Sequence, residues 1–200
     1  MSKTPSYEAR IVLKVKRSKF IGILQPVESL DDFQFFLKQL RKEFHNARHI
    51  CWAYRFADRE IVENSSDAGE PSGSAGRPIL NALRSHDAIQ TAVAVVRYFG
   101  GVKLGKKGLS EAYGSAAENL CREVQWKEWV VTEMVTILGD FKLVGKMEYW
   151  INQHQGKLVK DISGEQLKWI IKLPVETDYG RLVSLGVAIK KEANTTKPRR

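Results

Sequence analysis

The feature that most constrains the fold is a mostly apolar, β-branched stretch, residues 92–99, followed by a glycine-rich segment and a long helical pattern. A stretch of this composition is typical of a strand buried on both faces. The helix predicted after residues 100–108 gathers its inward side chains at Leu109, Ala112, Ala116, Leu120 and Val124. A buried strand beside a covering helix predicts a packed sheet with helices on it.

The rest of the first 126 residues fits this architecture. Alternation predicts a strand over 10–16 and another over 49–57, whose Ile50, Trp52, Tyr54 and Phe56 share one face. Three- and four-residue spacing predicts a helix over 30–44, with Ser29 as its N-cap. Residues 63–76 are polar and rich in glycine and serine, which predicts a loop, and a short helix is expected over 78–83.

The pattern restarts after about Trp126. In order, it predicts a strand over 130–138, a helix over 141–152, a hairpin of 157–162 with 166–173, a helix over 177–184 and an edge strand over 187–190. This β-α-β-β-α-β order is the ferredoxin-like motif. We therefore expect an α+β protein with domains at 1–126 and 130–192, followed by a basic tail at 193–200.

Composition narrows the class of protein. The 200 residues include 8 Phe, 5 Trp and 6 Tyr, which is too much apolar material for a disordered chain. No membrane helix or secretory leader is evident, and two cysteines make no disulfide framework, so a cytoplasmic location is expected. The net charge of +9 favours polyanionic partners such as RNA, although it also improves solubility.

The second glycine-rich segment is the stronger candidate for chemistry. It gathers cations and aromatic rings without an acid, at Arg97, Tyr98, Phe99, Lys103, Lys106 and Lys107. Cations neutralise phosphates and aromatic faces stack on bases, so this combination suits nucleic acid. The alternative is a buried strand end followed by a solvated turn. An ATPase loop is rejected because Lys107 stands where the magnesium-binding hydroxyl is required.

The first glycine-rich segment carries Asp67 and Glu70. These carboxylates could do acid–base or metal work, but capping of turns and helix starts is the favoured interpretation. His49 and Cys51 share a strand face, so a thiolate–imidazole pair between them is a hypothesis to check. A small buried cysteine is favoured for Cys51 and for Cys121. Residue chemistry alone therefore identifies no catalytic residue, metal or cofactor.

Four stretches resemble the IMPACT/YigZ family: RSKFIG (17–22), HICWAYR (49–55), SSDAGEPSGSAGRPIL (65–80) and RYFGGVKLGKKGLSEAY (97–113). The resemblance implies an N-terminal α+β domain of the kind shared by a ribosomal protein and elongation factor G. The C-terminal segment is similar to a C-terminal domain of elongation factor G. Eukaryotic members are linked to translation control, where they bind the activator of a regulatory kinase.

The sequence departs from the family pattern at four positions. Ile50 replaces a histidine and Ala68 replaces an acid, which weakens any catalytic or metal-binding role for a cleft between the two glycine-rich loops. Lys107 replaces a glycine and adds positive charge, whereas Glu111 replaces a basic residue and subtracts it. The resemblance therefore implies a translation-linked binding protein more than any reaction.

The leading hypothesis is non-catalytic binding to RNA or a ribosomal particle. The expected nucleic-acid or phosphate contacts, with Tyr98 stacking on a base, are Arg97, Tyr98, Lys103, Lys106, Lys107, His49, Arg55, Ser72, Ser74 and Arg77. The loops are expected to depend on Gly73, Gly76, Gly100, Gly101, Gly105 and Gly108. One alternative is a protein-interaction regulator with exposed anchors among Trp126, Trp129, Trp150 and Trp169. The other is an enzyme on a phosphorylated small molecule, with Asp67, Glu70 and His49 as acid–base groups.

Overall fold

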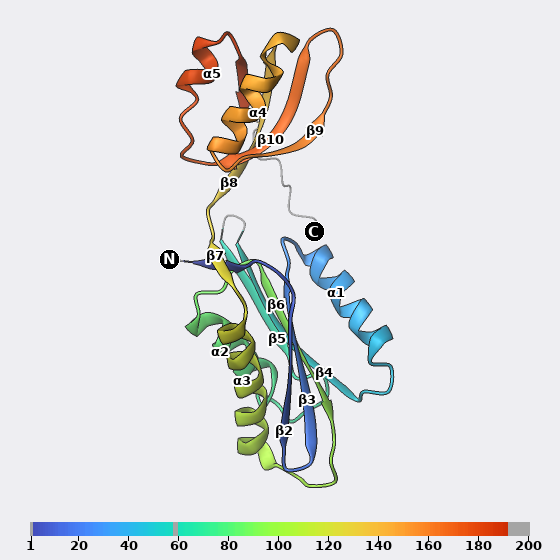
Figure 1. Ribbon diagram of the computed structural model, residues 1–200. Helices are drawn as coiled ribbons and strands as arrows, with labels where there is room; N and C mark the ends of the chain where they lie inside the picture. Colours follow the sequence, from blue (N-terminus) through green and yellow to red (C-terminus); the bar gives the residue numbers. More distant parts are fainter. Residues whose placement is uncertain (1, 58–59, 192–200) are drawn as a thin grey trace. The chain divides into compact units, whose positions relative to one another are not determined.

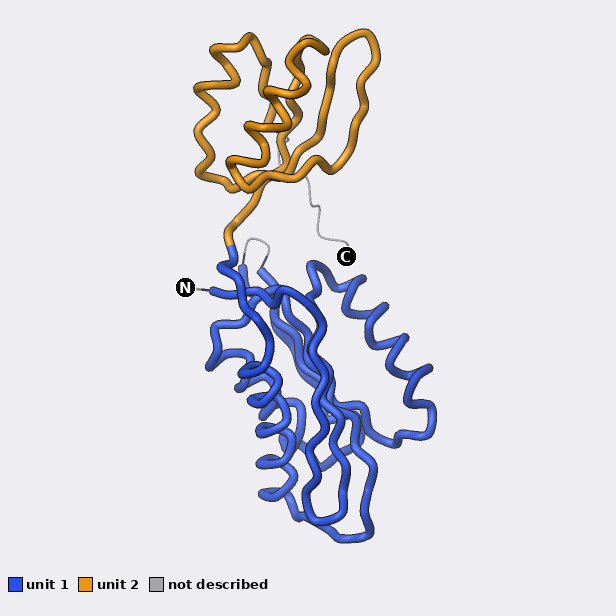
Figure 2. Tube along the Cα trace, in the orientation of Figure 1, with its two compact units in different colours: residues 1–129 blue, residues 130–200 orange. Residues whose placement is uncertain are grey.

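A computed structural model describes residues 2–57 and 60–191 (Figure 1). The chain divides into two compact units, residues 1–129 and 130–200, coloured separately in Figure 2. The expected basic tail at 193–200 lies outside the described residues. Each unit is mixed α+β, as the sequence predicted.

Unit 1 is built on a five-stranded antiparallel sheet. Its strands lie in the order β2 (Ala9–Val15), β3 (Ser18–Pro26), β6 (Thr91–Tyr98), β4 (His49–Ala57) and β5 (Ile61–Ser66). Strand β6 is central, and its residues 91–97 are all buried. This burial explains the continuous apolar run from which the strand was predicted.

Helices cover both faces of this sheet (Figure 1). Helix α1 (Leu30–Glu43) packs Phe33, Phe36, Leu37 and Leu40 against one face. Helices α2 (Gly76–Ser85) and α3 (Gly105–Glu123) cover the other face. Strand β6 serves both layers because its side chains alternate: Val93 and Val95 face α2 and α3, whereas Ala92, Ala94 and Val96 face α1.

Two local predictions are confirmed in these helices. The Ser29 hydroxyl accepts the backbone N–H of Asp32 at 3.1 Å, so Ser29 is the N-cap of α1. The inward positions predicted for the long helix are all buried: Leu109, Ala112, Ala116, Leu120 and Val124.

The prediction of a loop over 63–76 was partly wrong. Strand β5 continues to Ser66 and pairs with β4 over the register Trp52↔Ser66 to Ala57↔Ile61. An edge strand with half-exposed polar side chains is held by backbone hydrogen bonds, so it lacks the apolar alternation that reveals other strands. Helix α2 likewise begins at Gly76, two residues before the expected start.

A two-stranded ribbon closes unit 1. Strand β1 (Lys3–Pro5) pairs antiparallel with β7 (Trp126–Glu128), and the N–H of Trp129 donates to the carbonyl of Ser2 at 2.9 Å. The beginning of the chain is therefore fixed to the end of unit 1.

The described part of unit 2, residues 130–191, contains β8 (Thr132–Gly139), the 3₁₀ turn η1 (Phe141–Leu143), α4 (Val144–Gln153), β9 (Lys157–Asp161), β10 (Leu167–Pro174), α5 (Gly180–Ser184) and β11 (Ala188–Lys191). The strands form an antiparallel sheet in the order β11-β8-β10-β9. Helices α4 and α5 pack on the face that carries Val135, Ile137 and Ile171.

Two of the four tryptophans considered as exposed anchors belong to this core. Trp150 is 3% exposed and Trp169 is 4% exposed, so neither can anchor a partner. Trp126 and Trp129 are half-buried, and the indole N–H of Trp126 donates to the carbonyl of Cys121 at 2.8 Å. Among the described residues, no helix has the length and apolar character needed to cross a bilayer.

Candidate nucleic-acid interface

The first glycine-rich loop, residues 67–75, joins β5 to α2 and is organised by Asp67. Its carboxylate accepts the backbone N–H groups of Gly73 at 2.8 Å, Ala75 at 2.8 Å and Gly76 at 2.9 Å. Burial alone would raise the pKa of Asp67, but these three hydrogen bonds and the charge of Lys106 lower it below its ordinary value. Asp67 therefore caps the start of α2, as the capping interpretation predicted.

Glu70 connects the same loop to the centre of the sheet. Its Oε1 accepts from Nη1 of Arg97 at 2.7 Å and from the hydroxyl of Tyr113 at 2.9 Å, and all three residues are buried. The Arg97 guanidinium also lies over the rings of Phe20 and Phe99, with centroids 5.6 and 5.5 Å away. Arg97 and Glu70 are thus an internal pair, and Arg97 is not an exposed phosphate contact.

Strand β4 fixes the loop from below through two side chains. Nδ1 of His49 lies 2.9 Å from the carbonyl oxygen of Ala68, and the thiol of Cys51 donates to the carbonyl of Asp67 at 3.0 Å. Burial raises the pKa of Cys51 to about 12, so the thiol stays protonated at neutral pH. His49 and Cys51 therefore hold the first glycine-rich loop in place and do not form a thiolate–imidazole pair.

The second glycine-rich loop, residues 99–104, joins β6 to α3 and lies against the β2–β3 turn. A Cβ added at Gly100 would overlap the carbonyl group of Arg17, so only glycine permits this backbone contact. The N–H of Gly100 donates to the Ser18 hydroxyl at 3.3 Å. Gly101 and Gly105 have φ values of +86° and +70°, which glycine adopts without strain.

This contact assembles a surface that we call the basic end. It consists of the exposed cations of the β2–β3 hairpin, of the second loop and of the first turn of α3: Lys14, Lys16, Arg17, Lys19, Lys103, Lys106 and Lys107. Figure 1 shows the hairpin turn and the segment entering α3 at the same lower end of unit 1. Phe99 is 59% exposed and Tyr98 is half-buried beside them, while Glu111 lies 4.0 Å from Lys107.

The remaining predicted phosphate contacts divide into two groups. Ser72 and Arg77 are exposed, as a contact requires. Ser74 is fully buried, and its hydroxyl donates to the carbonyl of Pro71 at 2.6 Å. Arg55 was misplaced in the prediction: it is 9% exposed at the other end of β4, where its guanidinium donates to Glu63 at 2.8 Å and to the carbonyl of Ala88 at 3.2 Å.

The other predicted loop glycines have separate roles. Gly73 has a φ of +72° within the first loop, and a Cβ at Gly76 would lie 2.7 Å from the backbone nitrogen of Ser66. A Cβ at Gly108 would lie 3.2 Å from the Cβ of Leu104. Glycine at this position therefore lets Leu104, the last residue of the second loop, lie close to the first turn of α3.

Sequence reasoning missed the hairpin cations Lys14, Lys16, Arg17 and Lys19. Arg17 and Lys19 belong to the motif RSKFIG, residues 17–22, which lies about 80 residues before the second loop in the sequence. Only the folded structure brings these cations next to the second loop, because Lys19 is paired with Tyr98 in the sheet register and Gly100 leaves room for the β2–β3 turn.

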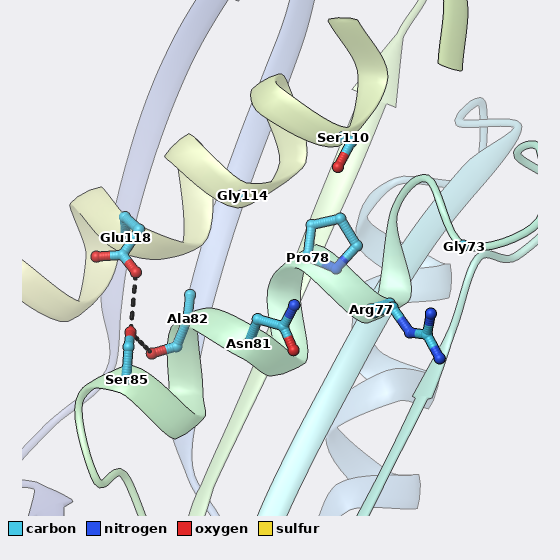
Figure 3. A pocket seen from close by; sticks show the side chains of 9 residues that line it. All are labelled: Gly73, Arg77, Pro78, Asn81, Ala82, Ser85, Ser110, Gly114 and Glu118. Atoms are coloured by element: carbon cyan, nitrogen blue, oxygen red, sulfur yellow. Dashed lines mark hydrogen bonds between the residues drawn. The ribbon is translucent and has the colours of Figure 1, made fainter. Parts of the chain in front are cut away.

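A groove of about 380 Å³ with a mixed polar and apolar lining lies between α2 and α3 (Figure 3). In it, the Ser85 hydroxyl lies 2.9 Å from the carbonyl of Ala82 and 3.0 Å from a carboxylate oxygen of Glu118. The other oxygen of Glu118 lies 2.9 Å from Nε2 of His86. The groove is not lined by any of the three candidate acid–base groups, Asp67, Glu70 and His49.

Comparison with known proteins identifies the class of the chain. The family model "Impact N-terminal domain" matches residues 16–121, which span strands β3 to β6, both glycine-rich loops and most of α3. The fold and the candidate site define a two-unit α+β protein whose unit 1 has a cationic end, formed by the β2–β3 hairpin, the second glycine-rich loop and the start of α3. This chain belongs to the IMPACT family, which confirms the resemblance found in the sequence.

Relatives in two bacteria extend beyond that domain. IMPACT family member YvyE of Bacillus subtilis is 33% identical over 148 residues, covering 74% of this chain and 68% of that protein. IMPACT family member YigZ of Escherichia coli is 29% identical over 157 residues, covering 78% of this chain and 77% of that protein. A crystal structure described as a hypothetical protein has a TM-score of 0.68 at 24% identity, with 95% of this chain and 96% of that chain covered, so it shares the fold.

Proposed function

We propose that this chain is a cytoplasmic, non-catalytic binding protein linked to translation, which contacts RNA of a ribosomal particle through the basic end of unit 1. The observation that carries the proposal is the seating of the β2–β3 turn against Gly100. This contact gathers cations from two parts of the chain about 80 residues apart onto one end of the sheet.

The chemistry of that surface suits a phosphate backbone with unpaired bases. Exposed lysines neutralise phosphates without dehydrating strongly, and the exposed ring of Phe99 offers a face on which a base can stack. Backbone N–H groups at the start of α3 add a partial positive charge at the same place.

The contacts of the candidate acid–base groups favour binding over catalysis. Asp67 accepts three backbone hydrogen bonds, Glu70 is buried against Arg97 and Tyr113, and His49 supports the carbonyl of Ala68. Each group has a structural use, and none of the three lines the groove between α2 and α3.

The domain assignments belong to the same proposal. We assign unit 1 to the α+β type shared by a ribosomal protein and elongation factor G, and unit 2 to the ferredoxin-like type. The support for unit 2 is its element order and its strand order β11-β8-β10-β9, which together are those of the βαββαβ motif.

The test is RNA binding across a salt titration. Fluorescence anisotropy of a labelled 20-nucleotide single-stranded RNA would be measured between about 50 and 300 mM NaCl for the wild type and for Lys103→Glu/Lys106→Glu. Loss of two phosphate contacts lowers the slope of log affinity against log salt by about 1.4, and the affinity at 0.1 M salt by roughly 25-fold. Sedimentation with purified ribosomal subunits would show the same loss.

The matched control is Lys3→Glu/Lys127→Glu. It changes the net charge equally at exposed lysines of the β1–β7 ribbon, at the other end of unit 1 in Figure 1. Equal weakening by both variants would mean that the net charge acts diffusely, and the proposed site would be wrong.

A further inference from the structure

One face of the unit 2 sheet is covered by neither α4 nor α5, the helices of the described part of this unit. Along β10, Leu167, Trp169, Ile171 and Leu173 are buried beneath α4 and α5, and the residues between them point to the opposite side. We call this opposite side the open face of unit 2. Among the described residues, none of the helices of this unit contributes to it.

The open face gathers lysines from three of the four strands. In the register of the sheet, Lys160 of β9, Ile170 of β10, Thr136 of β8 and Lys190 of β11 form one row across it. Lys168 and Leu138 belong to the next row, and Lys157 and Lys172 are paired on the other side. Lys157, Lys160 and Lys190 are exposed, and Lys168 is half-buried.

In the register of the sheet, the two carboxylates of these strands belong to the face that the helices cover. Glu133 is opposite Leu173 and accepts from the Tyr179 hydroxyl at 3.1 Å and from Lys191 at 2.7 Å. Asp161 is opposite Trp169 and accepts the N–H of Ser163 at 2.9 Å. Within the described strands, the open face therefore carries five lysines and no acid.

We propose that the open face of unit 2 is a second RNA-binding surface, which holds a single strand by its phosphate backbone. Four of these lysines, Lys157, Lys160, Lys168 and Lys190, place like charges on one side of a small sheet, where they repel each other, so a polyanion is the partner that their charge complements. That the polyanion is RNA rests on the proposed function, whereas the site is on a different unit.

The geometry also indicates how such a strand would be recognised. Neighbouring strands are about 4.8 Å apart, so the row from Lys160 to Lys190 is roughly 14 Å wide, a width that a few nucleotides can span. The side chains between the lysines are aliphatic or small, at Met134, Leu138, Ile170 and Ala188, and none is aromatic. Without rings for stacking, binding would depend on phosphates and show steep salt dependence with little base preference.

The experiment uses the full chain carrying Lys160→Glu/Lys190→Glu, two exposed positions on the edge strands β9 and β11. The probes are labelled single-stranded oligouridine and oligoadenosine RNAs, followed by anisotropy across a NaCl titration. We expect the salt slope to fall by about 1.4 and the affinity at 0.1 M salt to fall roughly 25-fold, equally for both RNAs.

The matched control is Lys142→Glu/Lys146→Glu, with the same charge change at exposed positions of η1 and α4. Equal weakening by the two variants, or no weakening by Lys160→Glu/Lys190→Glu, would overturn the inference and leave an acidic protein as the partner to seek. Circular dichroism of each variant establishes that it is folded.

The two surfaces can fail separately. If Lys103→Glu/Lys106→Glu leaves binding unchanged while Lys160→Glu/Lys190→Glu weakens it, the unit 1 site is wrong and the open face stands. The reverse result leaves the unit 1 proposal standing and removes the open face.

Discussion

Nη1 of Arg97 lies 2.7 Å from Oε1 of Glu70, and their side chains are 8% and 4% exposed. This ion pair fixes the first glycine-rich loop to the central strand of the sheet. A buried pair stabilises little by itself, but removal of one partner leaves a desolvated charge without compensation.

Glu70→Ala should therefore destabilise the chain by about 3–5 kcal/mol, because Arg97 stays buried without its carboxylate. Urea unfolding followed by circular dichroism measures the loss. Glu111→Ala, at an exposed carboxylate, should stay within about 0.5 kcal/mol of the wild type. The double variant Glu70→Leu/Arg97→Met should recover most of the loss, and a double variant no better than Glu70→Ala would contradict the charge argument.

Asp67→Asn should lower the free energy of unfolding at pH 7 by about 1–2 kcal/mol, because the charged acceptor of three N–H groups is removed. The folded state lowers the pKa of Asp67 below its ordinary value of 3.8. Its stabilisation is therefore fully present above pH 3.8 and is lost as the pH falls through the lowered value.

Urea unfolding at pH 7, 4 and 2.5 checks this dependence. The difference between wild type and Asp67→Asn should shrink at the lowest pH, where the carboxyl group is protonated. A constant difference across the series would rule out the carboxylate charge as its source.

Gly100→Ala should separate the β2–β3 hairpin from the second loop, because the new Cβ would overlap the Arg17 carbonyl. We expect a loss of about 2–3 kcal/mol, as for an overpacked site. Amide hydrogen exchange at Ser18 and Lys19 should accelerate. The control is Gly101→Ala, where a new Cβ would meet nothing within 4 Å but φ is +86°, so that only the loop is strained. If amide exchange at the hairpin were equally fast in this control, the proposed role of the Gly100–Arg17 contact would be wrong.

The sequence predicted those parts of the fold that local periodicity encodes. Strand β4 has a large apolar side chain at every second position, β6 is apolar at most positions, and Ser29 precedes an amphipathic helix, so all three were placed within a residue or two. Strand β5 was missed because Asn64, Ser65 and Ser66 are held at the sheet edge by backbone hydrogen bonds, for which a side-chain pattern carries no signal.

The candidate site was predictable by composition but not by geometry. Lys103, Lys106 and Lys107 are exposed as expected. The burial of Arg97 depends on Glu70, 27 residues earlier, and the hairpin cations join through Gly100, 82 residues after Ser18. Contacts at such separations follow from sheet register, which a single sequence does not determine.

The central position of β6 has a consequence for synthesis on the ribosome. Strands β3 and β4 both pair with β6, yet β6 is the last strand of its sheet to be made. Until Tyr98 has emerged, the β2–β3 and β4–β5 hairpins have no common partner, and β1 must wait longer still for β7. At roughly 5–20 residues per second, the first hairpin waits several seconds for its neighbour, so folding of unit 1 as a whole must follow, not accompany, its translation.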